Sequence, residues 1–276
     1  MTFIPRSHRL ADLTWPEIDE LRSHAPVAIV PLGATEQHGH GMAQRTDTTR
    51  AEVVADLIAR RMSPQVVVTP TIPVGMSEHH MAFPGTLTLS PVTLQQVVVE
   101  LVQSLHRHGW RRIFVLTGHG GNNAAVDVAV SRLRAELTDT HIAWSGVTPV
   151  VADLVKEHAD SRVRGHSCEI ETSQALYVDP DLVLPDRLTI GSSTLDDLEP
   201  AGRLARSRPG INFPQGYDSL SPTGNLGNPR LATTELGALL VDTVVDRICD
   251  FLAGLIGLPD RSPAPPPPAR IALETT

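Results

Sequence analysis

Cysteines, clusters of basic residues and long apolar runs are all scarce in this 276-residue chain. The two cysteines, Cys168 and Cys249, are too few for a disulfide framework and fit a reducing compartment. No apolar run follows a positive segment at the start of the chain, and no apolar run approaches the length that spans a membrane. We therefore expect a cytoplasmic protein without a signal peptide or a membrane partner.

The charge balance narrows the class of partner. The formal net charge is -8, and lysine and arginine do not gather in any one stretch. A protein that binds nucleic acid needs a basic face to displace counterions. The sequence therefore argues against a nucleic-acid partner and favours a small molecule or a short peptide.

Apolar segments of strand type alternate with longer segments of helical period along most of the chain. Strands are expected at 27–33, 65–70, 111–118 and 141–146, and helices at about 47–61, between Ser90 and Gly109, at 122–137, at about 150–158 and within 229–255. This alternation predicts a three-layer α/β/α sandwich with a mainly parallel sheet.

The length suits one domain, which we place at residues 1–257. Within it, residues 179–228 are expected to form long loops with short elements, because Pro, Gly, Asp and Ser interrupt every pattern there. Residues 258–276 are proline-rich, and we expect a poorly ordered tail.

Carboxylates and imidazoles crowd into the stretch LGATEQHGHGMAQRTD. Glu36 and His38 lie two residues apart just beyond an expected strand, and such side chains project to the same side of an extended backbone. Asp47 stands at the expected start of the next helix, where free backbone N–H groups favour a carboxylate. All three fall beyond the carboxyl end of a strand, where open α/β sheets bind ligands.

Two further segments are expected at the same edge. In VLTGHGGNN, glycines permit a tight turn that leaves His119 projecting over the edge. GHSCEIETS contains His166, and its Glu169 and Glu171 would share one face if the backbone were extended. Two histidines with three or four carboxylates can hold two divalent ions with one carboxylate bridging, and Zn²⁺, Mn²⁺ and Fe²⁺ all suit such ligands.

Structural roles compete with these chemical ones. Either EQH or GHGG alone is more typical of a turn than of a ligand pair. Cys168 is expected to be a small buried hydrophobe and not a nucleophile. Glu169 could form an ion pair with Arg162 or Arg164, and Asn122 could cap its helix or fix the turn.

Four segments together resemble, in order, the signature segments of the creatininase family of metal-dependent amidohydrolases. They are PLGATEQHGHGMAQRTD, EHHMAFPGTLTL, LTGHGGNN and GHSCEIETS. The resemblance runs from about residue 11 to 255. It implies an α/β sandwich, a dinuclear metal centre, hydrolysis of a C–N amide-type bond, and a homo-oligomer that is commonly a hexamer.

The resemblance also implies roles for single residues. Glu36 and His38 would each bind one metal, Asp47 would bridge both, and His119 would complete the shell of the first ion. His166 matches a histidine thought to shuttle protons. The implied substrate contacts lie in the loop before FPGTLTL and in the glycine-rich turn, and they are Glu78, His79, Gly120 and Asn122.

One departure from the family pattern concerns the second metal. Creatininase itself carries a metal-binding glutamate where this chain has Gly121, so a glutamate from elsewhere must close that shell. Glu171 is the first choice; Glu169 is the second choice and also a candidate catalytic residue. The tryptophans that creatininase places around its substrate have no clear counterparts here, which disfavours creatinine as the substrate.

Several activities stay open at this point. The leading hypothesis is hydrolysis of a cyclic amide, a formamide or a short peptide. The same metals could instead cleave a carbon–carbon bond of a cyclic keto-sugar. Two further alternatives are an inactive scaffold or binding subunit, and a mononuclear metal lyase or isomerase.

Overall fold

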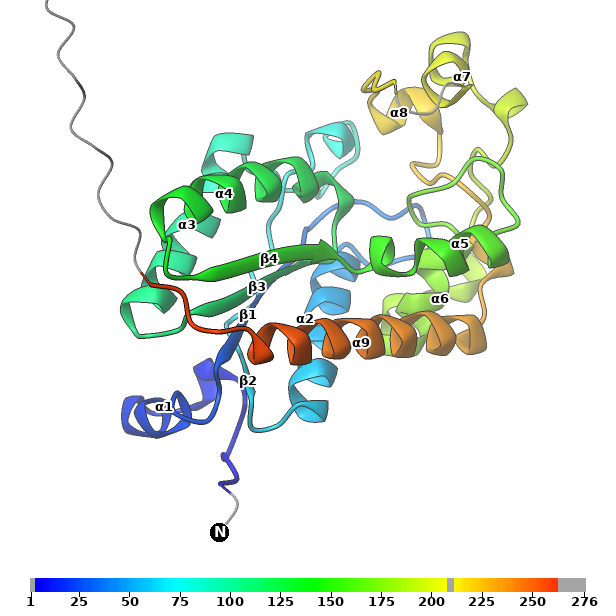
Figure 1. Cartoon of the computed structure of the whole chain (residues 1–276). Coiled ribbons are helices and arrows are strands. Elements are labelled where there is room, and N and C mark those ends of the chain that lie inside the picture. The colour runs from blue at the N-terminus through cyan, green and yellow to red at the C-terminus, as the bar shows by residue number, and fades with distance from the viewer. Residues whose placement is uncertain (1–2, 208–210, 263–276) are drawn as a thin grey trace, which may run out of the picture.

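The computed structural model describes residues 3–207 and 211–262. Its sheet consists of the four strands β1 (Val27–Leu32), β2 (Val66–Val68), β3 (Arg112–Thr117) and β4 (His141–Gly146). The strand order is β2-β1-β3-β4, and all three pairings are parallel (Figure 1). The carboxyl ends of the strands therefore meet at one edge of the sheet.

Helices cover both faces of this sheet. In the described residues they are α1 (Trp15–Leu21), α2 (Thr46–Arg61), α3 (Pro91–Arg107), α4 (Asn123–Glu136), α5 (Ala152–His158), α6 (Glu169–Val178), α7 (Pro200–Ser207), α8 (Tyr217–Leu220) and α9 (Thr234–Gly257). Figure 1 shows α3 and α4 on one face and α2 and α9 on the other. The predicted three-layer α/β/α sandwich is confirmed.

The core divides into two halves because side chains alternate along each buried strand. Val27 and Ile29 of β1 belong to the apolar cluster that includes α2 and α9. Ala28 and Val30, between and after them, belong to the cluster that includes α3 and α4. Burial on both faces explains why the strands are nearly continuous apolar runs.

The predicted limits of α3 are also confirmed. Ser90 is the N-cap, and its hydroxyl accepts a hydrogen bond from the Thr93 N–H at 3.2 Å. Gly109 follows the helix with a φ of +98°, a left-handed conformation that glycine adopts without strain. β2 is shorter than predicted, since only Val66–Val68 pairs with β1.

The segment GHSCEIETS contradicts its predicted conformation. From Glu169 it forms helix α6, which packs closely on α9 at Gly237. A Cβ at Gly237 would lie 2.0 Å from the Ser173 carbonyl oxygen, so this packing requires glycine. Residues two apart on a helix point in nearly opposite directions, and Glu169 and Glu171 therefore do not share a face.

Residues 179–228 contain short elements joined by loops, as predicted. α7 and α8 lie beyond the carboxyl edge of the sheet (Figure 1). Most of the predicted tail, residues 263–276, lies outside the described residues. The part that is described is attached to the sheet, because Arg112 donates a hydrogen bond to the Leu258 carbonyl at 2.7 Å.

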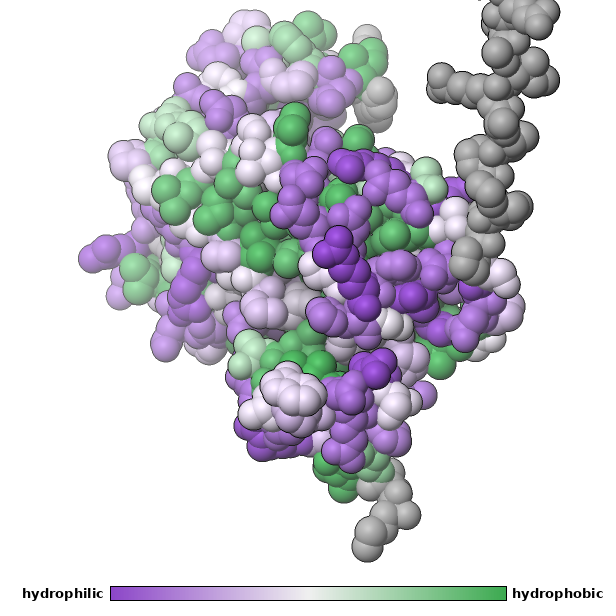
Figure 2. Space-filling view, turned by 90° about the vertical axis from the view of Figure 1, so that its left-hand side faces the viewer, coloured by the Kyte–Doolittle hydropathy of each residue, from purple (hydrophilic) through white to green (hydrophobic). Residues whose placement is uncertain are grey.

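The side of the molecule where the strands begin lies opposite the carboxyl edge of the sheet. Hydrophilic and hydrophobic residues are intermixed on this surface (Figure 2). No helix in the described ranges is both long and apolar enough to cross a membrane.

Candidate metal centre

The predicted metal ligands come together at the carboxyl edge of the sheet. Glu36 and His38 follow β1, Asp47 lies in the first turn of α2, His119 follows β3, and Glu171 lies in the first turn of α6. We call these five residues the ligand cluster. Nitrogen or oxygen atoms of Glu36, His38 and Asp47 lie within 4.8 Å of one another.

Asp47 lies between the two sides of the ligand cluster. Its Oδ2 is 3.1 Å from His119 Nδ1, and its Oδ1 is 3.6 Å from His38 Nε2. On the first side, Glu36 Oε2 lies 3.1 Å from His119 Nε2, the ring nitrogen on the far side from Asp47. On the second side, Glu171 Oε2 lies 3.7 Å from His38 Nε2. This is the arrangement that a bridging carboxylate requires.

Backbone carbonyls set the orientation of three histidine rings. His38 Nδ1 lies 3.1 Å from the Glu36 carbonyl, His119 Nε2 lies 3.1 Å from the Met76 carbonyl, and His166 Nε2 lies 2.7 Å from the Gln37 carbonyl. A carbonyl can only accept, so each of these ring nitrogens carries the proton. The other nitrogen of each ring faces the cluster and is the one that could bind a metal, as in metal sites with an outer shell of carbonyl acceptors.

Several buried atoms in this region have no hydrogen-bond partner within the part of the chain that the structure describes. They include Glu36 Oε1, His38 Nε2, Asp47 Oδ2 and His80 Nε2. Buried polar atoms are almost always paired, and a concentration of exceptions needs an explanation. Imidazole nitrogens and carboxylate oxygens are ligands of divalent transition metals, so these residues fit a metal centre.

The electrostatics of the cluster favour a cation. Burial alone would lower the pKa of His38, but the carboxylates of Asp47, Glu171 and Glu36 raise it to about 9. Burial opposes ionisation of Asp47 as well, yet His38 and His119 hold its pKa well below the ordinary range. Both shifts stabilise positive charge beside negative charge, and a metal ion can replace the proton in that role.

Rings from the loop after β2 and from α8 form one wall beside the cluster. His80 lies 4.1 Å from Tyr217 and 4.2 Å from His166, measured between ring centroids. His79 stacks parallel to His119 at 5.6 Å. Burial lowers the pKa of His79 to about 4, so this ring is neutral at pH 7. Sequence reasoning missed Tyr217, since only the fold brings its loop here.

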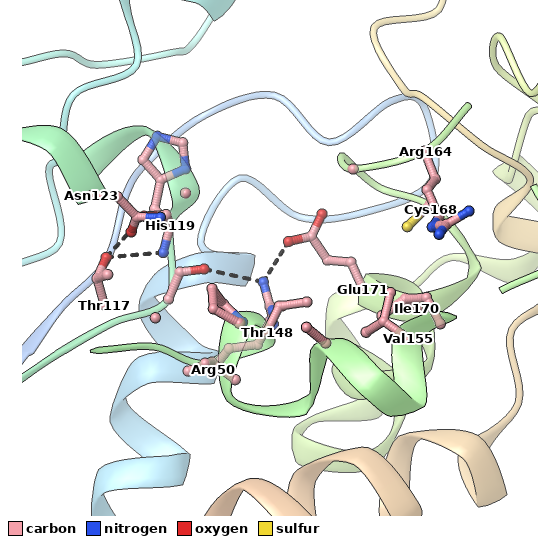
Figure 3. Close-up of a pocket in the computed structure, with 17 residues that line it drawn as sticks. Arg50, Thr117, His119, Asn123, Thr148, Val155, Arg164, Cys168, Ile170 and Glu171 are labelled. Carbon is pink, nitrogen blue, oxygen red and sulfur yellow. Dashed lines mark hydrogen bonds and ion pairs between the residues drawn. The ribbon is translucent and has the colours of Figure 1, made fainter. Parts of the chain in front are cut away.

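Arg50 is the second residue that sequence reasoning missed. It lies on α2, is buried, and its guanidinium contacts Asp47 at 3.2 Å. It also contacts Glu171 (Figure 3). The sequence held a signal, because residues three apart on a helix lie on the same face. Arg50 is therefore expected to adjoin Asp47 once 47–61 is recognised as a helix.

Glu169 is not part of the cluster. Its carboxylate accepts hydrogen bonds from the backbone N–H and the hydroxyl of Ser161, at 2.7 and 2.9 Å. Within the described residues it forms no ion pair with Arg162 or Arg164 either. The placement thus supports neither the catalytic role nor the ion pair expected for Glu169, because the helical backbone turns it away from Glu171.

The candidate substrate contacts are placed differently from one another. Asn122 is buried and fixes the turn: its amide donates to Gly33 and Thr117, and its oxygen accepts from the Met76 N–H at 2.8 Å. This bonding gives Asn122 a structural role in the turn, and its side chain makes no cap bond to α4 within the described residues. Gly120 lines the cavity described below, His79 lies in the wall of rings, and Glu78 is exposed.

Gly121 cannot be replaced by a larger residue without a shift of its surroundings. A Cβ there would lie 2.3 Å from His119 Nε2 and 2.5 Å from the Met76 carbonyl. The glycine-rich turn therefore offers no carboxylate for the second metal. Glu171 lies on the His38 side of Asp47, where such a carboxylate ligand would be required.

A cavity of about 450 Å³ adjoins the cluster at His119 and Glu171. Figure 3 shows both side chains at this cavity, with Val155 and Ile170 in its wall. Arg164 supplies a positive charge at the same cavity. The cavity can hold a small molecule or a few residues of a peptide next to the candidate metals.

A parallel α/β sheet with imidazole and carboxylate side chains at its carboxyl edge is the setting of a metal-dependent enzyme. A family model described as creatinine amidohydrolase matches residues 11–252. The chain belongs to the creatininase family. The family is one of hydrolases, and the prediction from the four sequence segments is confirmed.

The chain is also similar to individual characterised proteins. The chain is 34% identical over 261 residues to the mycofactocin precursor peptide peptidase of Mycobacterium ulcerans. This alignment covers 90% of this chain and 95% of the relative. It is 29% identical over 260 residues to the creatinine amidohydrolase of Pseudomonas putida. This alignment covers 88% of this chain and 95% of the relative.

Solved structures agree with the fold. A zinc–zinc form of a creatininase variant has a TM-score of 0.75 at 26% identity, and a manganese form of creatininase has a TM-score of 0.74 at 27% identity. Each covers 92% of this chain and 100% of the other chain.

Proposed function

We propose that this protein is a dinuclear metal-dependent hydrolase that cleaves a C–N amide-type bond, with a short peptide as the leading substrate class. One observation carries the proposal: Asp47 presents one oxygen toward His119 and the other toward His38, with unpartnered ligand atoms on both sides. A mononuclear site would need only half of this arrangement.

The two ions would be held by overlapping sets of ligands. Glu36, Asp47 and His119 would hold the first, and His38, Asp47 and Glu171 the second. Two divalent ions bound there would supply Lewis acidity toward the substrate carbonyl and a nucleophilic hydroxide near neutral pH. The zinc and manganese forms of the related creatininases support either metal, and Fe²⁺ fits the same ligands.

We propose His166 as the residue that moves protons. Its Nε2–H is engaged by the Gln37 carbonyl, so only Nδ1, which lies 3.5 Å from Glu36, can take up a proton. Burial and the nearby His38 and His80 hold its pKa well below the ordinary value. A proton accepted at Nδ1 is therefore readily passed on, which suits delivery to the leaving nitrogen.

The choice of a peptide rests on two supports. The peptidase relative is more similar to this chain than the creatinine amidohydrolase. The cavity beside the cluster is also larger than a single small ring requires and has apolar walls. We further propose a homo-oligomer, a hexamer by family resemblance, in the cytoplasm and without a nucleic-acid or membrane partner.

The test begins with protein stripped by a chelator and reloaded with Zn²⁺, Mn²⁺ or Fe²⁺. Reloaded protein is assayed against short peptides, formamides, cyclic amides and a cyclic keto-sugar, with Asp47→Asn as the inactive control. We expect metal-dependent release of an amine from a peptide. Turnover of the keto-sugar alone would assign the carbon–carbon chemistry, and absence of metal binding under every loading condition would indicate a scaffold.

A further inference from the structure

Arg50 is a charged residue buried to 1% exposure next to the ligand cluster. Its Nη1 contacts Asp47 and Glu171, and its Nη2 donates to Thr148 at 2.8 Å and also to Gln174. A buried guanidinium is stabilised by well-placed acceptors. Acceptors meet both terminal nitrogens of Arg50, while its Nε has no hydrogen-bond partner among the described residues. Two of these acceptors are candidate metal ligands.

The contacts of Glu171 suggest what Arg50 does. Glu171 Oε1 is held by the Arg50 guanidinium, while Oε2 accepts from the Ser167 N–H at 2.6 Å and lies 3.7 Å from His38 Nε2. With one oxygen anchored, the other is kept on the side of the cluster where His38 lies. Figure 3 shows the Arg50 and Glu171 side chains directed at each other across the edge of the cavity.

This chain has a particular need for such an anchor. Gly121 leaves the glycine-rich turn without a carboxylate, so the second ion depends on Glu171 from α6. Asp47 comes from α2, three residues before Arg50. One guanidinium therefore ties a ligand on α2 to a ligand on α6.

We propose that Arg50 is a positioning residue that orients Glu171 for the second metal ion. This inference rests on the proposed dinuclear function. It assigns to Arg50 no contact with substrate and no proton transfer.

Charge and orientation make opposite predictions for a variant. The positive charge of Arg50 repels a metal ion, so loss of charge alone would tighten metal binding. Loss of orientation would instead weaken the second ion selectively. Arg50→Lys separates the two effects, because lysine keeps the charge but cannot hold two carboxylates with a planar fork.

The experiment measures the affinities of the two ions by titrating Mn²⁺ into metal-stripped protein, with the exchange-coupled Mn²⁺ pair followed by electron paramagnetic resonance. For Arg50→Lys we expect the second ion to bind about 10- to 100-fold more weakly, the range typical for loss of an outer-shell partner, and the first ion to be little changed. The variant Glu171→Gln and the double variant complete a cycle. If Arg50 acts through Glu171, the double variant binds the second ion no more weakly than Glu171→Gln does.

Arg45→Lys is the matched control. Arg45 also lies at the start of α2 and pairs with a carboxylate at the end of α6, Asp179, at 2.8 Å, but outside the cluster. The Arg45→Lys variant should bind both ions with the affinities of the wild type. Thr148→Val removes one hydrogen bond to Arg50 without changing charge, and it should weaken the second ion in the same direction by a smaller factor.

The outcomes distinguish the two proposals. If the wild type binds only one ion, the dinuclear function fails. If the wild type binds two and Arg50→Lys binds both with unchanged affinity, the role of Arg50 alone is overturned. Equal weakening of both ions in Arg50→Lys would also overturn it, since that result indicates a general structural role. If Arg50→Lys does not fold, an unchanged second ion in Thr148→Val rejects the proposal.

Discussion

Two buried groups of polar side chains meet helix α6, and they differ in how their atoms are satisfied. Glu169 bonds to Ser161 and to the Asn228 N–H, and none of its carboxylate oxygens is left without a partner. The ligand cluster, which includes Glu171 two residues further on, leaves Glu36 Oε1, His38 Nε2 and Asp47 Oδ2 unpaired. Burial of an acid is common to both groups, so the unpaired ligand atoms distinguish the candidate functional site from the structural one.

The largest effect is expected for Asp47→Asn, because this substitution changes the proposed shared ligand of the ligand cluster and leaves the Glu169 group intact. An amide keeps the shape of Asp47 but cannot bridge two cations. We expect loss of bound metal and at least about 1,000-fold lower hydrolysis. Metal content by emission spectroscopy and the peptide assay measure the two quantities. An Asp47→Asn protein that hydrolyses peptide without metal would contradict the assignment.

Glu171→Gln should have the next largest effect, because it removes one ligand of the second ion only. We expect about one bound ion per chain in place of two, and about 100-fold lower activity. The stoichiometry is obtained from metal analysis after dialysis. Two tightly bound ions in this variant would mean that a different residue completes the second shell.

Glu169→Gln makes the same chemical change on the opposite side of α6 and is the matched control for Glu171→Gln. Its new NH2 group would face either the Ser161 N–H or the Asn228 N–H, so one backbone donor would lose its acceptor, which costs about 1–3 kcal/mol of folding free energy. We expect a melting temperature lower by several degrees with unchanged metal stoichiometry. Loss of a metal ion from Glu169→Gln would remove the distinction between the two groups.

The smallest effect concerns Cys168, which lies next to Glu169 and is also buried. Burial raises the pKa of this thiol from 9 to about 11. The folded state therefore disfavours the thiolate, so stability should not change with this group below pH 9 and should decline as the pH rises from 9 toward 11. In a Cys249→Ser background, alkylation by iodoacetamide should be slow in the folded protein up to about pH 10 and fast after unfolding. Rapid alkylation at pH 8 would show a reactive thiol.

The comparison also shows what could be predicted from the sequence. The strands, the main helices and the positions of Glu36, His38, Asp47 and His119 follow from local patterns: apolar runs, helical periodicity, and ligands placed just after a strand. These signals lie within a few residues of the features they describe, so they survive without knowledge of the tertiary structure.

What could not be predicted depends on contacts between distant segments. The segment with Glu169 and Glu171 was expected to be a strand or loop, because its helical state is stabilised by packing on α9 some 60 residues later. Tyr217 reaches the site only through the path of a long irregular region. A single arginine in a helix is ordinary in sequence, and only the contacts of Arg50 with Glu171 and Gln174 from α6 mark it as part of the site.

The most direct test of the account is a crystal structure of protein loaded with Zn²⁺ or Mn²⁺, with anomalous diffraction recorded at the absorption edge of the metal. The account predicts two anomalous peaks per chain, one on each side of Asp47, with His119 at the first and His38 and Glu171 at the second. A single peak, or peaks that do not share Asp47, would contradict the dinuclear centre.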